Sequence, residues 1–367
     1  MSSELLFAKY PGIDLEPGNS IGAKWLRLLD QLQLPAFARE KRIAIKMHLG
    51  GGYGFSTIHP YLVRQLVSKL NQAGAAEVFV CDGPNAVRHA AERGYTSETI
   101  GCQIVPVAGT CDKYFYRRKI DPPFRGVEEV ELAGEIVDVD AMVDFSHLKG
   151  HGCCAFGGAS KNLSMGAVVH STRRKLHRLE GGIDRDDERC NRCGLCAAHC
   201  PSNAISCAPG EPPKFNFHEC KFCQHCVLIC PQKALSMSGG GYEAFQQGMA
   251  RTTAEVLKTF APGNVLFISL LKDITIFCDC WGMTTPSLVP DIGILAGRDI
   301  VAIESAALDL IKTENLIPGA LPAQYQVNPA DQHHLFEQVH GKDPFVVVRA
   351  LQQLGCGSPE YTLREVN

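Results

Sequence analysis

Hydrophobic and polar positions follow two periods along most of the chain, and together they predict strands that alternate with helices. Apolar runs of strand length occupy residues 42–49, 77–83, 103–109 and 141–148. Between the first two runs, apolar residues recur at helical spacing, at Leu62, Val63, Leu66, Val67 and Leu70, and Gly74 ends the segment. Residues 86–95 form the next predicted helix. This succession is typical of a parallel or mixed sheet that is covered by helices on both faces.

The alternation stops at a segment rich in cysteine and proline, which glycines at 181–182 and 239–241 flank, and it resumes afterwards. The later pattern predicts a helix over residues 242–260, a strand over 264–271 and a helix over 300–311 that Asp299 caps. We therefore expect a discontinuous α/β body, formed by residues 1–182 and 239–367. The cysteine-rich residues 183–238 would form a small module inserted into it.

The insert contains one cysteine motif twice, as CNRCGLCAAHCP and CKFCQHCVLICP. Both copies follow the C-x2-C-x2-C-x3-C-P spacing of bacterial ferredoxins, in which three cysteines bind one cluster and the fourth binds the other. The motifs predict two [4Fe–4S] clusters in a small α+β, ferredoxin-like module. The expected ligands are Cys190, Cys193, Cys196 and Cys230 for one cluster, and Cys220, Cys223, Cys226 and Cys200 for the other.

A pair of zinc sites is the alternative interpretation of these cysteines. A single C-x2-C pair is compatible with zinc, but two complete copies that each end in Cys-Pro favour iron–sulfur clusters. Two clusters imply one-electron transfer, for which the insert alone would suffice. The body, which is several times longer, therefore needs a role of its own.

Composition and charge narrow the classes of function. Of the 367 residues, 45% are hydrophobic and 20% are charged, and the formal net charge of −3 gives no indication of nucleic-acid binding. The 17 cysteines are clustered and the first residues lack a signal-peptide pattern, so metal binding or catalysis fits better than disulfides. No apolar run reaches the roughly 18 residues that span a bilayer. We expect a cytoplasmic protein with neither a nucleic-acid nor a membrane partner.

Residues 46–57 (KMHLGGGYGFST) join a predicted strand to a predicted helix. Lys46 and His48 would lie on one face of the strand, and backbone N–H groups at such a junction can bind an anion. The segment matches neither a nucleotide P-loop nor G-x-G-x-x-G, so a plain tight turn is the alternative. We expect Lys46 and His48 to take part in cofactor binding.

Residues 147–166 (HLKGHGCCAFGGASKNLSMG) follow a predicted strand and are polar and rich in glycine. Ligand sites in α/β proteins gather at the carboxyl ends of strands, and Gly157 and Gly158 would let the backbone approach a cofactor closely. The candidate catalytic residues are Lys149, His151 and Lys161, as anion-binding groups or proton donors, and Asn162, as an orienting amide. A solvated loop is the alternative. Of Cys153 and Cys154, one could be a ligand or nucleophile and the other buried.

Two further stretches carry candidate chemistry. In FCDCWG, Cys278 and Cys280 on a strand would point to one face, about 6.6 Å apart. Because this is the upper edge for a disulfide, two thiols or a metal pair fit better, with simple packing as the alternative. The basic run 170–178 could attract an acidic electron carrier or an anionic substrate, but a solvated connector is the simpler interpretation.

The order of these blocks resembles the iron–sulfur branch of the domain of unknown function 362 family. KMHLGGGYG, CDGPN, HLKGHGCCAFGGASKNLSMG, the two ferredoxin motifs, KDITIFCDCWG, VPDIGIL and LGCGSPEY follow one another over nearly the whole chain. The family's central segment reads close to K-x-H, G-F-G-G and K-N-x-x-M-G, which is matched by Lys149, His151, Phe156, Gly157, Gly158, Lys161, Asn162, Met165 and Gly166. Cys153, Cys154 and Ala155 depart from this pattern. The resemblance implies the architecture and a polar site paired with clusters, but no substrate.

These observations predict an iron–sulfur oxidoreductase. Electrons from a ferredoxin-like or other low-potential donor would pass through two [4Fe–4S] clusters to a polar site in the body, where a small anionic substrate binds. A further metal, at Cys278 and Cys280, or an organic cofactor could also bind there. Two alternatives stay open: an electron-transfer or metal-handling accessory protein without turnover, and a binding protein whose clusters are structural.

Overall fold

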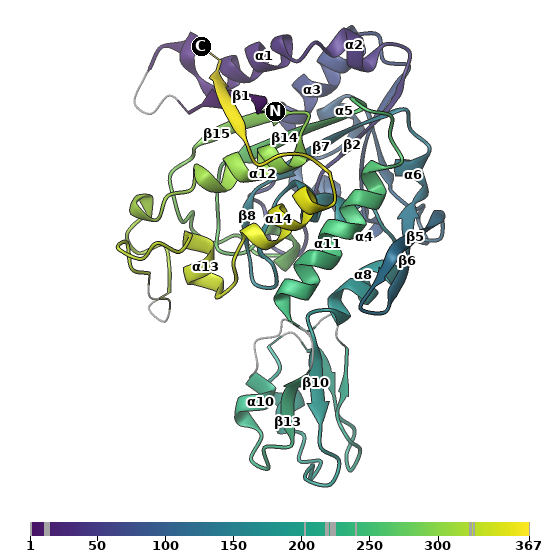
Figure 1. The fold of residues 1–367 in the computed structure, drawn as a ribbon, viewed down its shortest axis with the longest axis vertical. Coiled ribbons are helices and arrows are strands. Elements are labelled where there is room, and N and C mark those ends of the chain that lie inside the picture. Colours follow the sequence, from purple (N-terminus) through teal and green to yellow (C-terminus); the bar gives the residue numbers. More distant parts are fainter. Residues whose placement is uncertain are drawn as a thin grey trace.

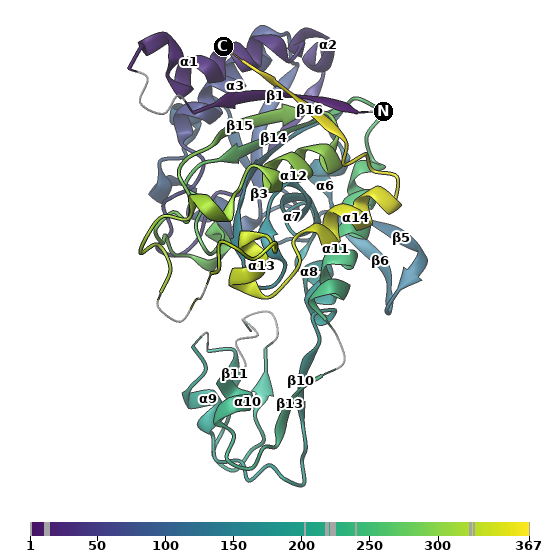
Figure 2. The ribbon, with the colours of Figure 1, turned by 60° about the vertical axis from the view of Figure 1, so that its left-hand side comes forward.

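The computed structural model describes residues 2–10, 15–201, 203–216, 220, 225–238, 241–322, 325 and 327–366. An eight-stranded sheet forms the centre of the body, in the order β16-β1-β15-β14-β7-β2-β3-β4 (Figures 1 and 2). Its strands are β1 (Ser3–Lys9), β2 (Arg42–Lys46), β3 (Glu77–Asp82), β4 (Gln103–Pro106), β7 (Ala141–His147), β14 (Val265–Leu271), β15 (Gly293–Gly297) and β16 (Tyr361–Glu365). The strands from β14 to β4 are parallel, whereas β15 is antiparallel to both of its neighbours. The predicted α/β body with a mixed sheet is confirmed.

Side chains alternate between the two faces of the sheet, and each face packs into its own apolar core. Ile43 and Ile45 of β2 point into one core, whereas Ala44 points into the other. The first face is covered by α1 (Ile21–Gln31), α2 (Leu34–Ala38), α3 (Pro60–Gln72) and α5 (Ser97–Ile100). The second face is covered by α7 (Ala159–Ser164), α11 (Tyr242–Leu257), α12 (Ile300–Asp309) and α14 (Phe345–Gln353). Because both faces are covered, polar side chains gather at the strand ends.

Most helices form where the hydrophobic pattern predicts them. The helix α3 buries the five apolar residues from Leu62 to Leu70 that indicated it. The carboxylate of Asp299 accepts hydrogen bonds from the backbone N–H groups of Val301 and Ala302 and caps α12, as expected.

Residues 86–95 differ from the predicted single helix. They form the end of the short α4 (Pro84–Arg88) and a separate 3-10 turn over Ala90–Arg93. The Arg93 guanidinium donates hydrogen bonds to the carbonyl groups of Gly52, Gly54 and His89. These contacts hold the segment against the glycine-rich residues 50–54, and local helix propensity does not reveal them.

Shorter elements complete the body. They are the hairpin of β5 (Phe115–Phe124) and β6 (Val127–Ala133), α6 (Gly134–Val137), the hairpin of β8 (Lys149–His151) and β9 (Ala155–Gly157), α8 (His170–Arg178) and α13 (Leu335–His340). The solvated-loop alternative for residues 147–166 is wrong, because the β8–β9 hairpin is buried and continues into α7. Among the described residues, none of the helices has the length and apolar character needed to cross a membrane.

The cysteine-rich segment projects from one end of the body, beyond α8 and α11 (Figure 1). β10 (Gly182–Arg185) pairs antiparallel with β13 (Leu235–Ser238), so the two ends of the segment leave the body side by side. Between them lie α9 (Leu195–Ala198), β11 (Ile205–Ser206), β12 (Lys214–Phe215) and α10 (His225–Ile229). These elements share a small core of their own, formed by Ile183, Cys196, Ile205, Cys226 and Leu235.

Candidate functional site

A cavity of about 880 Å³ opens at the carboxyl ends of β2, β3 and β7, where Lys46, Asp82 and His147 end their strands. The structure brings together nine of the ten residues that the sequence indicates outside the insert. Lys46, His48, His151, Gly157, Gly158, Lys161, Asn162, Cys278 and Cys280 all line this cavity. The segments 46–57, 147–162 and 278–280 are therefore parts of one site.

Lys46 is held in a buried network at the floor of the cavity. Its Nζ donates to Asp82 Oδ1 (3.1 Å), Asn162 Oδ1 (2.8 Å) and the Met47 carbonyl (3.0 Å), which uses all three of its hydrogens. Burial alone would raise the pKa of Asp82, but the charges of Lys46 and His48 hold it well below its usual range. Lys46 therefore neutralises Asp82 and is not a free cation.

Asn162 connects α7 to the ends of two strands. Its Nδ2 donates to the Lys46 carbonyl (2.9 Å) and to Asp144 Oδ1 (3.2 Å). Asp144 is fully buried, and burial raises its pKa well above the ordinary value. Gly166 packs against the same network, since a Cβ there would lie 2.5 Å from Lys46 Cε and 2.4 Å from the Asn162 carbonyl oxygen.

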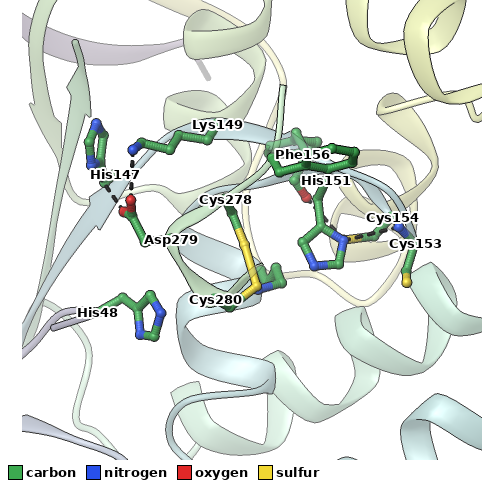
Figure 3. The surroundings of a disulfide bond; sticks show 12 residues. His48, His147, Lys149, His151, Cys153, Cys154, Phe156, Cys278, Asp279 and Cys280 are labelled. Carbon is green, nitrogen blue, oxygen red and sulfur yellow. Dashed lines mark hydrogen bonds and ion pairs between the residues drawn. A yellow bond between two sulfur atoms is a disulfide. The ribbon is translucent and has the colours of Figure 1, made fainter. Parts of the chain in front are cut away.

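Lys149 is the one predicted residue that does not line the cavity. Its Nζ donates to the Ser56 carbonyl (2.8 Å), to Ser56 Oγ (2.7 Å) and to Asp279 Oδ1 (2.7 Å). The other carboxylate oxygen of Asp279 lies 3.4 Å from His147 Nδ1 (Figure 3). Burial lowers the pKa of Lys149 and the nearby Asp279 opposes this shift. Lys149 therefore holds the hairpin in place and has no donor left for a substrate.

Cys278 and Cys280 differ from their expected arrangement. They flank Asp279 at a 3-10 turn (Asp279–Trp281) and not on a strand, and their Cα atoms are 5.4 Å apart. Because the turn brings them closer than a strand would, the two sulfur atoms form a disulfide where we expected two thiols or a metal pair (Figure 3). Cys278 is buried and Cys280 is exposed. Lys161 Nζ lies 3.5 Å and 3.4 Å from their respective Sγ atoms.

His151 faces the same two sulfurs from the hairpin. Its Nδ1 accepts a hydrogen bond from the Cys153 backbone N–H (3.1 Å), and burial lowers its pKa well below the usual value. A ring nitrogen of His151 and the sulfurs of Cys278 and Cys280 lie within 4.8 Å of one another. These three side chains could hold one metal ion once the disulfide is reduced, because a metal needs thiolate ligands.

Cys153 and Cys154 are both buried. The Cys154 thiol donates to the Phe156 carbonyl (3.0 Å) and lies 3.3 Å from His151 Nδ1 (Figure 3). Burial raises the pKa of Cys154 to about 12 and that of Cys153 well above its ordinary value. A buried thiol with a raised pKa is a poor nucleophile, so these two cysteines support the hairpin.

The charges that line the cavity are mostly paired. Asp82 faces Lys46, Asp112 lies 3.1 Å from Arg173, and Asp279 faces Lys149. Lys161 forms no ion pair with a carboxylate within the part of the chain that the structure describes, and burial lowers its pKa. Its ammonium group is therefore the cation in this cavity that is placed to meet an anion.

The insert reaches the rim of the cavity. Cys220 lines it, together with His170, Arg173 and His177 from one face of α8. The basic run 170–178 is thus more than the solvated connector that we expected, since Thr172 and Leu176 are buried and the opposite residues line the cavity. Its helical spacing of three and four residues was the signal for this role.

The described cysteines of the insert gather around one small cavity and in the core of the insert. Cys190, Cys193, Cys196 and Cys230 line one small cavity. The Ala204 N–H donates to Cys200 Sγ (3.2 Å), and the Ala234 N–H donates to Cys230 Sγ (3.3 Å), at the same position in both motifs. Cys200, Cys220 and Cys226 pack in the core of the insert. Cys223 lies outside the described residues.

Sequence reasoning missed the acidic partners of the site. Asp82, Asp144 and Asp279 were not proposed as site residues, although each contacts a lysine or an amide of the cavity network. Asp144 interrupts the apolar run of β7, and Asp82 ends β3 beside Lys46. A charged residue within or at the end of a buried parallel strand was the signal that could have identified them.

Comparisons with known proteins give a family but no activity. A family model described as "Domain of unknown function (DUF362)" matches residues 43–309. No curated protein matches the chain. A crystal structure of a protein from Thermotoga maritima has a TM-score of 0.34 and 11% identity, and covers 68% of this chain and 49% of its own. The lactate racemase apoprotein from Thermoanaerobacterium thermosaccharolyticum has a TM-score of 0.32 and 10% identity, with 74% and 51% covered. The chain thus spans about half the length of these two proteins.

Proposed function

The chain belongs to the domain of unknown function 362 family, whose description names no activity, and from the site itself we propose that it is an iron–sulfur oxidoreductase. The insert would bind two [4Fe–4S] clusters, which supply one-electron transfer when bound. A ferredoxin-like or other low-potential protein would be the donor. Electrons would reach the cavity at the ends of β2, β3 and β7, where a small anionic substrate binds.

The arrangement of the cysteines supports the ligand sets proposed for the clusters. The four residues assigned to the first set, Cys190, Cys193, Cys196 and Cys230, line a common cavity although Cys230 comes from the second motif. Cys200 and Cys230, the residues that exchange between the motifs, each accept a backbone N–H bond. Hydrogen bonds to the sulfurs stabilise thiolate ligands and tune their clusters.

The observation that carries the proposal is the position of Cys220. This residue belongs to the second proposed ligand set and lines the same cavity as Lys161, His151 and Cys280. One proposed ligand set therefore adjoins the candidate substrate site. An electron-transfer module with no role in the body's chemistry would not need this contact.

The cavity side chains suit the reduction of an anion. Lys161 offers a positive charge that no carboxylate of the described chain neutralises. Reduction of an organic group consumes protons together with electrons, and His48 and His151 both line the cavity. With Nδ1 of His151 accepting the Cys153 N–H, the neutral ring carries its proton on Nε2 and can donate it.

A metal-handling accessory protein is the second candidate. The group of His151, Cys278 and Cys280 favours it, because these side chains could bind one soft metal ion without any turnover. The variant Lys161→Met separates the two candidates. An oxidoreductase should lose binding of small carboxylate, phosphate or sulfite anions, measured by calorimetry, and keep its clusters. An accessory protein should show no such anion binding in either form.

Substitution of Cys220 tests whether the proposed ligand set beside the cavity binds a cluster. Substitution of Cys207 provides the control. Cys207 lies between the two motifs, in neither of them. We expect Cys220→Ser, purified without oxygen, to lose about half of its iron and sulfide, since one of two four-iron clusters loses a ligand. Cys207→Ser should keep both in full. Equal iron contents in the two variants would contradict the proposal.

A further inference from the structure

We propose that Cys278 and Cys280 are a redox-active pair that exchanges thiol for disulfide with a small anionic disulfide bound in the cavity. This exchange needs only the two sulfurs and the residues around them. Renewal of the reduced pair by electrons from the insert rests on the function proposed above. The experiment below therefore tests the two parts separately.

The disulfide has little value as a structural crosslink. It joins residues only two positions apart, and the stabilisation that a disulfide gives by restricting the unfolded chain grows with the length of the closed loop. Cys280 is exposed and lines the cavity. Exposed disulfides are typically the labile, regulatory or catalytic ones. A reactive role therefore explains this bridge better than a stabilising one.

Cys280 is exposed to the cavity and Cys278 is buried, so the two cysteines would act in different steps of the exchange. In the reduced pair, the exposed Cys280 thiolate would attack one sulfur of the substrate disulfide and release one substrate thiol. The buried Cys278, at 6% exposure, would then attack the mixed disulfide at Cys280. This second step releases the other substrate thiol and restores the Cys278–Cys280 bond. The substrate gains two electrons and two protons, and the pair loses them.

Lys161 serves both the sulfurs and the substrate. Its ammonium donates to each Sγ, at 3.4–3.5 Å, and a positive charge at this distance stabilises a thiolate. Gly157 leaves room for this contact, because a Cβ there would lie 3.0 Å from Lys161 Cδ. The same charge would attract a carboxylate of the substrate. A cavity of about 880 Å³ has the volume to admit a peptide-sized disulfide.

His151 favours this exchange over a metal site. A histidine that binds a metal through one nitrogen usually donates its other N–H to an acceptor. Here Nδ1 is itself the acceptor of the Cys153 N–H. The neutral ring therefore carries hydrogen on Nε2, and this arrangement suits a proton donor to a leaving thiolate better than a metal ligand.

The disulfide would return to the dithiol by taking up two electrons and two protons. The two proposed clusters each carry one electron, so together they match this demand. Cys220 lines the cavity that holds the pair. The pair would thus combine two one-electron transfers into one two-electron reduction.

Trapping of the mixed disulfide tests the exchange without using the clusters. We would incubate pre-reduced Cys278→Ser with glutathione disulfide, which is anionic, or with cystamine, which is cationic, and map adducts by peptide mass spectrometry. We expect a dithiol-reversible glutathione adduct on Cys280, formed at least tenfold faster than the cystamine adduct. Lys161→Met should abolish this preference, and Lys161→Arg should retain it. Cys207, which is a partly exposed free cysteine and does not line the cavity, is the reference for unselective reaction.

Several outcomes would overturn the exchange. They are no adduct on Cys280, adducts at Cys207 and Cys280 at equal rates, or tight zinc binding that protects both thiols of the reduced wild-type protein. A second measurement addresses the electron source, by comparing dithionite-driven reduction of the pair in the wild type and in Cys220→Ser. If the adduct forms but the two proteins behave alike, the exchange stands and the proposed path of electrons from the insert falls.

Discussion

Nζ of Lys149 lies 2.7 Å from Oδ1 of Asp279, and both side chains are almost completely buried. This ion pair joins the β8–β9 hairpin to the turn that carries Cys278 and Cys280, across 130 positions of the sequence. Lys149 therefore shapes the cavity from behind, by fixing the two segments that supply His151 and the cysteine pair.

Substitution of Lys149 should destabilise the protein strongly. Lys149→Met leaves the Asp279 carboxylate buried without its cation, and breaking a buried pair in this way costs about 3–5 kcal/mol of unfolding free energy. Chemical denaturation measures this loss. Lys214→Met, which breaks an exposed pair with Glu211, is the control and should cost less than about 1 kcal/mol. Similar losses in the two variants would show that Lys149 is not a structural anchor.

Much of the body could be predicted from the sequence, because burial imposes a period on the chain. The runs at 42–49 and 264–271 and the spacing of Leu62 to Leu70 show which side chains face a core, whatever that core contains. The pairing of Lys149 with Asp279 has no such local signal. This pairing depends on how two segments meet in the folded chain. The sequence alone therefore leads us to predict that Lys149 binds an anion or donates a proton.

The geometry of Cys278 and Cys280 could not be predicted from the sequence either, although the two residues are only two positions apart. Strand geometry would separate Cys278 and Cys280 by about 6.6 Å, and the sequence offers no reason to expect the 3-10 turn that brings their Cα atoms to 5.4 Å. This turn packs against the residues 50–54, where Gly52 and Gly282 are in contact. The contact between Gly52 and Gly282, which lie far apart in the sequence, thus helps to position the turn that carries Cys278 and Cys280.

A methyl group at Gly166 should disturb the Lys46 network. In Gly166→Ala the new Cβ would lie 2.5 Å from Lys46 Cε and 2.4 Å from a backbone oxygen, so the side chain must shift. Overpacking of this kind costs about 1–3 kcal/mol. Gly83→Ala, also at the cavity, is a matched control because a Cβ at this position would have open space within 4 Å. Thermal unfolding of both variants tests this, and equal melting temperatures would contradict it.

Stability should fall between about pH 4.5 and pH 7 because of Glu304. Burial raises the pKa of this carboxyl group to about 7. The folded state therefore keeps a proton that the unfolded state has already released, and the free energy of unfolding decreases as pH rises through this window. Glu304→Gln removes the effect, and should be more stable than the wild type by about 3 kcal/mol at pH 8 and nearly equal to it below pH 4.5. A difference between the two proteins that does not change with pH, in urea denaturation, would rule this out.

The central claim is that the insert carries two [4Fe–4S] clusters beside the cavity of the body. The most direct test is the iron, acid-labile sulfide and zinc content of the protein purified without oxygen. We expect about eight irons and eight sulfides per chain, which two four-iron clusters require. Zinc with little or no sulfide would contradict the claim, and with it the proposed transfer of electrons to Cys278 and Cys280.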